Sequence, residues 1–472
     1  MERQGTDARD VMRILLISCN ICRTPYPVYP LGLGMIASAL RRAAHDVRQF
    51  DFLESGQSLD ALEAALGQIE PGLVGLSIRN IDNVNLLNEQ RYLDVAATIV
   101  GTVRRASRAP VVLGGSGFSL MPEAILNLTG ADYGVVGEGE EVIVDLARRI
   151  EDGAPPTEKC LRASRTIAGS AISSALFDSR LLRYYRASGT IVPVQTKRGC
   201  DFRCVYCTYP VLEGTRIRHR RPREVVDELF SLSQDEGVEH FFFADSVFND
   251  RSHGYRDLLT EMRRRGLKIP WTAFFAPRDL DDETVSLMAG TGLVGAEIGT
   301  DAACDVTLAG LGKSFRWNDV VETNRLFSRH AIGHAHHVMF GGPGECQDTV
   351  REGIENLRKL QHTVCFVSMG IRILPGTPLH RVAVCEGVVE PDRSLVDSVY
   401  YLSPALDKTW LEQALKDGFA GVRHCAFPPD SFDRSLSVLY RLGYPGFQVA
   451  QGQDGRGHPR AANNMNAPTP RV

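Results

Sequence analysis

The run Lys197-Arg-Gly-Cys-Asp-Phe-Arg-Cys-Val-Tyr-Cys-Thr-Tyr209 places three cysteines at tight spacing, at Cys200, Cys204 and Cys207. An apolar, β-branched segment at 192–196 precedes it and predicts a buried strand, so the cysteines are expected in the loop that follows. Structural zinc requires four closed ligands, which disfavours it here. Three thiolates can hold three irons of a four-iron cluster and leave the fourth iron open to bind a ligand. A chance grouping and disulfides are the disfavoured alternatives.

Strand-like and helix-like segments alternate around this loop from residue 191 to 386. About six βα units are too few for an eight-fold barrel, so we expect a partial barrel. The expected strands are 192–196, 240–244, 271–275, 295–298, 335–339 and 367–373. The expected helices are 222–234, 255–265, 282–290, 317–330 and 346–360.

A second α/β unit is expected ahead of the cysteines, at 13–151. Its expected strands are 13–18, 47–50, 73–78, 110–113 and 133–136, with helices at 31–44, 59–69, 89–105, 122–128 and 140–150. This alternation predicts a doubly wound, flavodoxin-like sheet. Ligands of such sheets bind at the carboxyl ends of the strands, where this chain has polar and glycine-rich turns.

The cysteine run, with an aromatic residue (Tyr206) before its last cysteine, resembles that of the radical S-adenosylmethionine (SAM) enzymes. The segment 213–228 and the preceding α/β unit resemble the methyltransferase-like members that carry an N-terminal cobalamin (B12)-binding domain. This resemblance covers residues 13 to about 400 and implies a partial (β/α)6 barrel. It also implies that the three cysteines bind a [4Fe–4S] cluster, whose open iron binds SAM. One electron then cleaves SAM to methionine and a 5′-deoxyadenosyl radical.

The resemblance implies a set of SAM-binding residues. Asp245 matches the position that meets the methionine amine, with helix capping as the alternative. The fourth strand ends in Gly295-Ala-Glu-Ile-Gly-Thr-Asp301, where relatives have a Gly-Ile/Val-Glu-Ser-Gly motif, so either Glu297 or Asp301 is the acidic residue. We favour Asp301, because it falls in the loop. The full set of candidates is Tyr206, Asp245, Asp301, Gly341, Gly342 and Arg372.

Three more of these candidates, Gly341, Gly342 and Arg372, also have open alternatives. The glycines Gly341 and Gly342 are explained equally well by a tight turn. Arg372 can meet the SAM carboxylate, the substrate or a salt-bridge partner. Lys313 is interpreted as a structural charge at a helix end.

Cobalamin-binding candidates come from the turns of the N-terminal unit. The cobalt-binding D-x-H-x-x-G motif of mutases is absent, but the cobalamin-dependent radical SAM group commonly lacks that histidine. Arg79, Asn80 and Asp82 follow the third expected strand, with ordinary turn chemistry as the alternative. The full set is Tyr29, Arg79, Asn80, Asp82, Gly114, Gly115, Ser116, Gly137 and Glu138.

Composition limits the remaining possibilities. The chain has 53 Lys and Arg against 57 Asp and Glu, a net charge of −4, which argues against a nucleic-acid partner. It has no apolar run of about 18 residues and no apolar signal segment at its start, so we expect no membrane span and a cytoplasmic location. We expect a disordered N-terminus at 1–12, a linker at 152–190, a C-terminal cap at 387–447 and a disordered tail at 448–472.

The leading hypothesis is a cobalamin-dependent radical SAM enzyme that methylates an unactivated carbon of a small molecule, a specialised metabolite or lipid. The resemblance implies a 5′-deoxyadenosyl radical, methylcobalamin and an external one-electron reductant of flavodoxin or ferredoxin type. One alternative uses the same cofactors for a ring rearrangement or radical C–C coupling without methyl transfer. Another is a cofactor-binding sensor without catalysis. The sequence does not name the substrate.

Overall fold

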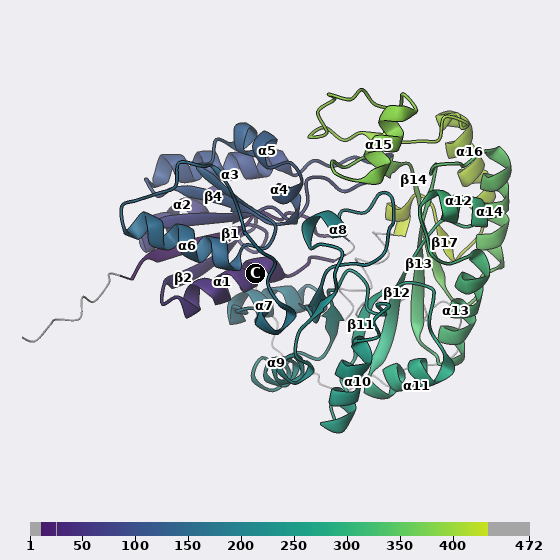
Figure 1. The fold of residues 1–472 in the computed structure, drawn as a ribbon, viewed down its shortest axis with the longest axis horizontal. Coiled ribbons are helices and arrows are strands. Elements are labelled where there is room, and N and C mark those ends of the chain that lie inside the picture. Colours follow the sequence, from purple (N-terminus) through teal and green to yellow (C-terminus); the bar gives the residue numbers. More distant parts are fainter. Residues whose placement is uncertain (1–10, 25, 433–472) are drawn as a thin grey trace, which may run out of the picture.

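Two parallel β-sheets form the centres of the molecule in the computed structural model, which describes residues 11–24 and 26–432. Figure 1 shows the N-terminal sheet with its helices on the left and the second sheet on the right, with α8 (Tyr209–Leu212) between them. No helix of the described residues is both long and apolar enough to cross a membrane.

The N-terminal sheet has the order β2-β1-β3-β4-β5-β6, with every strand parallel to its neighbours. The first five strands give the predicted flavodoxin-like order. Helices α2, α3 and α5 cover one face, where they share a core with β1, β3 and β4, and α1 and α6 cover the other. The strands are β1 (Arg13–Ser18), β2 (Asp46–Asp51), β3 (Leu73–Ser77), β4 (Val111–Gly114), β5 (Tyr133–Val136) and β6 (Cys160–Arg162). The helices are α1 (Leu31–Arg42), α2 (Leu59–Ile69), α3 (Leu93–Ala106), α4 (Ser116–Leu120), α5 (Pro122–Thr129) and α6 (Glu140–Glu151).

The segment 152–190, expected as a linker, is instead partly folded. It contributes β6 to the sheet edge, the short 3₁₀ turn η1 (Gly169–Ala171) and helix α7 (Ser179–Ala187), which is capped by the Asp178 carboxylate. A three-residue edge strand is too short to give a period in the sequence. Helix α7 buries Leu181, Leu182 and Tyr185 in the core of the second sheet, so tertiary packing defines it.

The second sheet carries six parallel strands in chain order, β7-β10-β11-β12-β13-β14, which agrees with the predicted partial barrel. Figure 1 shows α10, α11, α13 and α14 along its outer side. The strands are β7 (Val192–Val194), β10 (Phe241–Phe243), β11 (Trp271–Phe275), β12 (Leu293–Asp301), β13 (Gly333–Phe340) and β14 (Val364–Met369). The helices are α9 (Pro222–Asp235), α10 (Tyr255–Arg264), α11 (Asp282–Thr291), α12 (Asp305–Gly310), α13 (Trp317–Arg329) and α14 (Gln347–Lys359).

The C-terminal segments close the open edge of this sheet. Strand β17 (Cys425–Ala426) pairs with β14, and β15 (Ile371–Arg372) pairs antiparallel with β16 (Tyr400–Tyr401). Helix α15 (Pro378–Cys385) ends just before the expected cap, and α16 (Lys408–Phe419) and the turn η2 (Pro429–Phe432) lie in the part of the cap that the structure describes. The rest of the expected cap, the expected tail and residues 1–10 lie outside the described residues.

Candidate active site

The cysteine loop is framed by a short hairpin, β8 (Lys197–Arg198) with β9 (Arg218–His219). Gly199 has φ +94°, and a Cβ there would lie 2.2 Å from the carbonyl oxygen of Arg216, so only glycine fits. The Gly199 N–H donates to Glu213 Oε2 at 2.9 Å, and the Cys200 N–H donates to the Gly214 carbonyl at 3.1 Å. The hairpin therefore fixes the chain at the residue before the first cysteine.

The three thiols lie on one loop, with Cys200 buried and Cys204 and Cys207 half-buried. Burial raises the pKa of Cys207 to about 12 and that of Cys200 above its usual range. Among the described residues, no three His, Cys, Asp or Glu side chains are close enough to hold a single metal ion. Each thiolate of a cubane cluster binds a different iron, so its ligands lie farther apart than those of one ion. A donor set of three cysteines on one loop fits such a cluster.

A carboxylate and an ammonium group lie beside Cys204. Tyr206 Oη donates to Asp301 Oδ2 at 2.5 Å, and Lys313 Nζ donates to Cys204 Sγ at 3.3 Å while forming an ion pair with Asp301. Burial lowers the pKa of Lys313, but Asp301 and Cys204 outweigh it and hold the pKa above its usual value. Asp301 has φ +62°, a left-handed conformation that aspartate tolerates better than most residues. The two opposite charges complement a ligand group that carries both an amine and a carboxylate.

Glu297, the other acidic candidate, has a different partner. Its Oε2 lies 2.6 Å from His337 Nε2, and the His337 ring stacks on Phe366 at 5.4 Å. Burial lowers the pKa of His337, but Glu297 raises it more, which favours an imidazolium–carboxylate pair. Among the described residues no hydrogen bond or ion pair joins Glu297 to the cysteine loop. This geometry supports Asp301, and the assignment stays a prediction.

Asp245 lies at the end of β10 with both carboxylate oxygens already occupied. It is buried and accepts hydrogen bonds from Thr196 N at 2.7 Å, Thr196 Oγ1 at 2.5 Å and Lys197 N at 3.2 Å. It does not cap α10, whose N-cap is Gly254. The visible role of Asp245 is to join the ends of β7 and β10, and its contact with SAM stays a prediction.

The glycines after β13 form a tight turn around a buried carboxyl group. The N–H groups of Gly341 and Gly342 both donate to Glu345 Oε2, the latter at 3.0 Å. Gly341 has φ +100°, and a Cβ there would lie 2.5 Å from Leu402. Burial raises the pKa of Glu345 to about 7. The turn explains both glycines, so their contact with SAM also stays a prediction.

Arg372 and Asp82, which the sequence assigns to different cofactors, pair with each other. Arg372 Nε donates to Asp82 Oδ2 at 2.8 Å, and their side chains are 3% and 2% exposed. Arg372 also donates to the carbonyls of Ile373 and Leu395, both at 2.7 Å. Ser398 Oγ donates to Asp82 at 3.1 Å. The salt-bridge alternative for Arg372 is thus the one visible in the structure, and it ties the turn after β3 to the second sheet.

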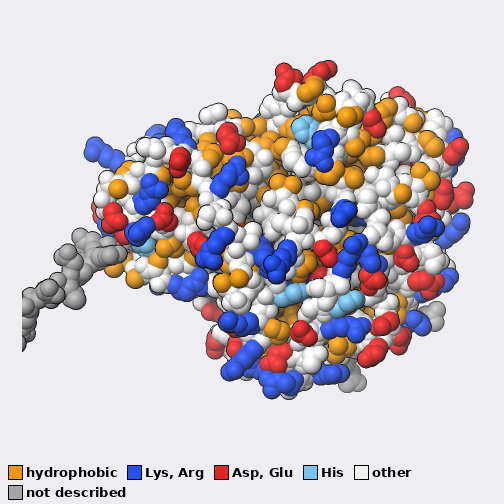
Figure 2. Space-filling view, viewed as in Figure 1, with side chains coloured by type: hydrophobic (Ala, Val, Ile, Leu, Met, Phe, Trp, Pro, Cys, Tyr) orange, Lys and Arg blue, Asp and Glu red, His pale blue; other side chains and the backbone are white. Residues whose placement is uncertain are grey.

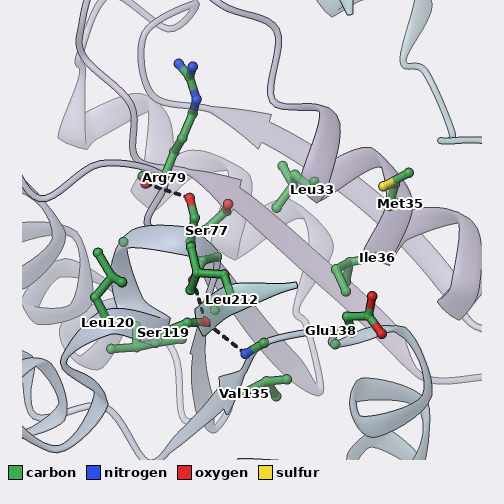
Figure 3. Close-up of a pocket in the computed structure, with 18 of the residues that line it drawn as sticks. Leu33, Met35, Ile36, Ser77, Arg79, Ser119, Leu120, Val135, Glu138 and Leu212 are labelled. Carbon is green, nitrogen blue, oxygen red and sulfur yellow. Dashed lines mark hydrogen bonds between the residues drawn. The ribbon is translucent and has the colours of Figure 1, made fainter. Parts of the chain in front are cut away.

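A cavity of about 460 Å³ lies at the carboxyl edge of the N-terminal sheet (Figure 3). Its wall includes every cobalamin-binding candidate except Tyr29, namely Arg79, Asn80, Asp82, Gly114, Gly115, Ser116, Gly137 and Glu138. Tyr29 is instead buried against Phe177 and Tyr185, where its hydroxyl accepts a hydrogen bond from the Asp178 N–H at 3.0 Å. Its large ring makes it a core residue in this structure.

Backbone packing shapes the mouth of the cavity. Gly115 has φ +98°, and a Cβ there would lie 2.6 Å from the Ile78 carbonyl oxygen. Ser116 Oγ donates to the Arg79 carbonyl at 2.8 Å, and the Gly137 N–H donates to Ser119 Oγ at 2.9 Å, as Figure 3 shows. The exposed Arg79 side chain extends away from these turns.

The sequence does not reveal which barrel residues complete this wall. They are Gln195, Arg198, Thr208, Tyr209, Leu212, Glu213 and Leu374. No sequence pattern predicts them, because their place depends on how the two sheets dock. The inner wall is aliphatic, with Leu16, Leu33, Val112, Val135 and Ile143. An apolar slot with a mouth of glycine-rich backbone suits the insertion of part of a corrinoid.

Two family models match the chain in the same order as the two sheets. The model described as "B12 binding domain" matches residues 17–147, and that of the "Radical SAM superfamily" matches residues 194–357. The chain belongs to the radical SAM enzymes that carry a B12-binding domain. Cobalamin, a [4Fe–4S] cluster and SAM are the cofactors of this radical SAM enzyme family.

Individual relatives agree with this assignment. The chain is 27% identical to tryptophan 2-C-methyltransferase of Streptomyces laurentii, over 77% of this chain and 73% of the relative. It is 23% identical to cytidylyl-2-hydroxyethylphosphonate methyltransferase of Streptomyces wedmorensis, over 84% and 86%. The structure of the radical SAM methyltransferase TsrM from Kitasatospora setae, with cobalamin and a [4Fe–4S] cluster bound, superposes with a TM-score of 0.80 at 25% identity, over 94% of this chain and 98% of that one. This radical SAM enzyme is therefore a methyltransferase of the cobalamin-dependent group.

Proposed function

We propose that the protein transfers a methyl group to an unactivated carbon of a small molecule. The observation that carries this proposal is the shared cavity wall. Tyr209, Leu212 and Glu213, which follow the cysteines directly, line the same cavity as the glycine turns of the B12-binding domain. A methyl-donating cofactor in that cavity and a cluster on that loop would therefore face a common space.

The chain's own residues have separable tasks in this proposal. When bound, cobalamin supplies a transferable methyl group, and SAM at the cluster supplies a 5′-deoxyadenosyl radical. Cys200, Cys204 and Cys207 hold the cluster. Asp301 and Lys313 orient the amine and the carboxylate of the SAM methionine, since both charges lie beside Cys204.

The relatives support a small-molecule substrate. The Streptomyces laurentii relative is named for the methylation of tryptophan at carbon, and the TsrM structure has also been solved with tryptophan and a SAM analogue bound. We propose an organic small molecule of this size class. The proposal includes an external one-electron reductant, because radical formation from SAM consumes one electron.

Isotope transfer tests the reaction type. The anaerobically reconstituted enzyme would be supplied with SAM carrying a trideuterated methyl group, a reductant, and L-tryptophan and simple indoles as probes. We expect 5′-deoxyadenosine, S-adenosylhomocysteine and a probe carrying the label on carbon, all detected by mass spectrometry. Cys204→Ala, reconstituted in parallel, is the matched control and should form none of the three.

Two outcomes would contradict the proposal. A probe that is consumed without gaining the label would favour the rearrangement or coupling chemistry. Failure to form either SAM-derived product from any probe, by an enzyme loaded with cobalamin and cluster, would favour a binding protein without catalysis.

A further inference from the structure

The cysteine loop has a second side that does not line the cavity. Phe202, between the first two cysteines, packs against Cys200, Val247 and Ala276, with Cys204 at the edge of the same cluster. Phe202 is buried, at 8% exposed, whereas the next residue of the loop, Arg203, is exposed. This side of the loop is therefore the side on which a partner can approach the cluster without entering the cavity.

Two guanidinium groups lie over this ring. Arg251 lies over the Phe202 ring at 5.1 Å and Arg278 at 5.9 Å from its centroid. Arg203, the next residue of the loop, is exposed. Cations stacked on an aromatic face are held in place, which makes a positive surface of defined shape.

Most of this positive charge is not neutralised. Among the described residues, Arg203 and Arg251 form no ion pair, whereas Arg278 pairs with Asp279 at 2.6 Å. Figure 2 shows Lys and Arg side chains over the middle and lower part of the face that carries α8, α9 and α10, with acidic side chains among them. The chain as a whole is weakly acidic, and Arg203 and Arg251 are exposed positive charges in it without an ion-pair partner among the described residues.

We propose that the exposed Arg203 and Arg251, together with Arg278 over the Phe202 ring, form the docking surface for an acidic one-electron carrier protein of the flavodoxin or ferredoxin class. The inference rests on the radical chemistry proposed above, which consumes one electron per SAM cleaved. In the docked complex the carrier is oxidised by one electron and the cluster is reduced by one, and no bond forms or breaks. Opposite charges on the two proteins speed their encounter and fix its orientation.

Charge reversal on this surface tests the proposal. Arg251→Glu and Arg203→Glu/Arg251→Glu would be reconstituted in the full chain, and their iron content compared with that of the unchanged protein. Cluster reduction would be followed by stopped-flow absorbance with reduced flavodoxin, with reduced ferredoxin, and with dithionite, a small reductant that needs no docking. Arg108→Glu is the matched control, because Arg108 is exposed in the turn before β4, at the opposite edge of the N-terminal sheet.

At low ionic strength, we expect cluster reduction by at least one of the two carriers to be about tenfold or more slower in the double variant than in the unchanged protein. The rate of reduction by dithionite should stay the same. Raising the salt concentration should slow the unchanged protein toward the variant, since screening removes the same attraction. Arg108→Glu should behave like the unchanged protein.

Three outcomes would contradict a proposal. Carrier-driven rates of the double variant within twofold of those of the unchanged protein, or no salt dependence, would overturn the docking surface. A parallel loss with dithionite would place the arginines in cluster assembly and would also overturn it. Failure of all reductants in the unchanged protein would instead count against the proposed function.

Discussion

The buried pair between Asp82 and Arg372 predicts that the B12-binding domain and the barrel depend on each other for stability. Arg372→Met keeps a long side chain but removes the charge. The Asp82 carboxylate, 2% exposed, would then keep only Val84 N–H and Ser398 Oγ as partners. Removing one partner of a buried ion pair costs about 3–5 kcal/mol, because the other charge is left uncompensated.

The expected cost can be converted into a melting temperature. Unfolding of about 400 residues, at about 2 cal/mol/K per residue, has an entropy near 0.8 kcal/mol/K, so a loss of about 4 kcal/mol lowers Tm by about 5 °C. Circular dichroism of the anaerobically purified chain measures this shift. Asp82→Asn/Arg372→Met removes both charges, and we expect it to melt about 2–3 °C above the single arginine variant, since contacting residues couple by about 2 kcal/mol.

A surface pair provides the control for this measurement. Arg325 and Glu322 on α13 are 68% and 57% exposed, so Arg325→Met should change Tm by less than about 1 °C. Equal melting of Arg372→Met and Arg325→Met would refute the reasoning, as would a double variant no more stable than the single one. An unchanged Tm together with weaker cobalamin or SAM binding would assign the two residues to cofactor binding instead.

Three further predictions follow from single side chains. Cys204→Ala should lose nearly all reconstituted iron and the visible cluster absorbance, whereas the same change at the exposed Cys385 should not. Gly115→Ala should lower both Tm and cobalamin loading, because the added Cβ would lie 2.6 Å from a carbonyl oxygen. Gly130 also has a positive φ but lies in open space, so Gly130→Ala should lower the free energy of unfolding by only about 1 kcal/mol and leave cobalamin loading intact. The folded-state pKa of Glu345, about 7, is raised above its ordinary value of 4.5, so its contribution to stability is present below pH 4.5 and is lost as pH rises through 7. Glu345→Gln should therefore remove up to about 3 kcal/mol of the fall in the free energy of unfolding across that window, and melting curves at several pH values would measure it.

Strong periodicity made most of the fold predictable. Strand β1 and helix α2 have the predicted bounds. Strand β1 is an apolar run, and α2 is an amphipathic helix with a capping serine, so both have a clear pattern in the sequence. Strand β12 extends beyond the predicted 295–298, since its end is a polar Gly-Thr-Asp segment that pairs with β13. The two-residue β17 and the three-residue β6 depend on a neighbouring strand, and such short edges leave no pattern in sequence.

The sequence predicted the positions of site residues only where the topology of the sheet determines them. The carboxyl ends of parallel strands meet at one edge, so the turns after β3, β4 and β5 were expected together, and the cavity unites them. No comparable rule of topology predicts which side chain will pair with a buried charge. Asp245 accepts hydrogen bonds from Thr196 and Lys197, and Asp82 pairs with Arg372, and none of these contacts has a fixed spacing along the chain. Lys313, interpreted as a helix-end charge, lies beside Cys204 because the turn after α12 contacts the cysteine loop, where the Val205 N–H donates to the Leu311 carbonyl at 3.0 Å.

The ion pairs that cross between the domains predict that the position of the cysteine loop depends on the B12-binding domain as well as on the barrel. Arg198, two residues before Cys200, pairs with Glu138 at 3.3 Å and with Glu140, both from the B12-binding domain. Arg218, its partner across the hairpin, pairs with Glu138 at 2.7 Å. Without the N-terminal domain the hairpin would carry two guanidinium groups that have lost these carboxylates, at a cost of several kcal/mol each if they stayed buried. The hairpin that fixes Gly199 would relax to hydrate them, and the first cysteine would lose its position. The B12-binding domain thus contributes to the position of the cysteine loop through Glu138 and Glu140, as well as to the cavity.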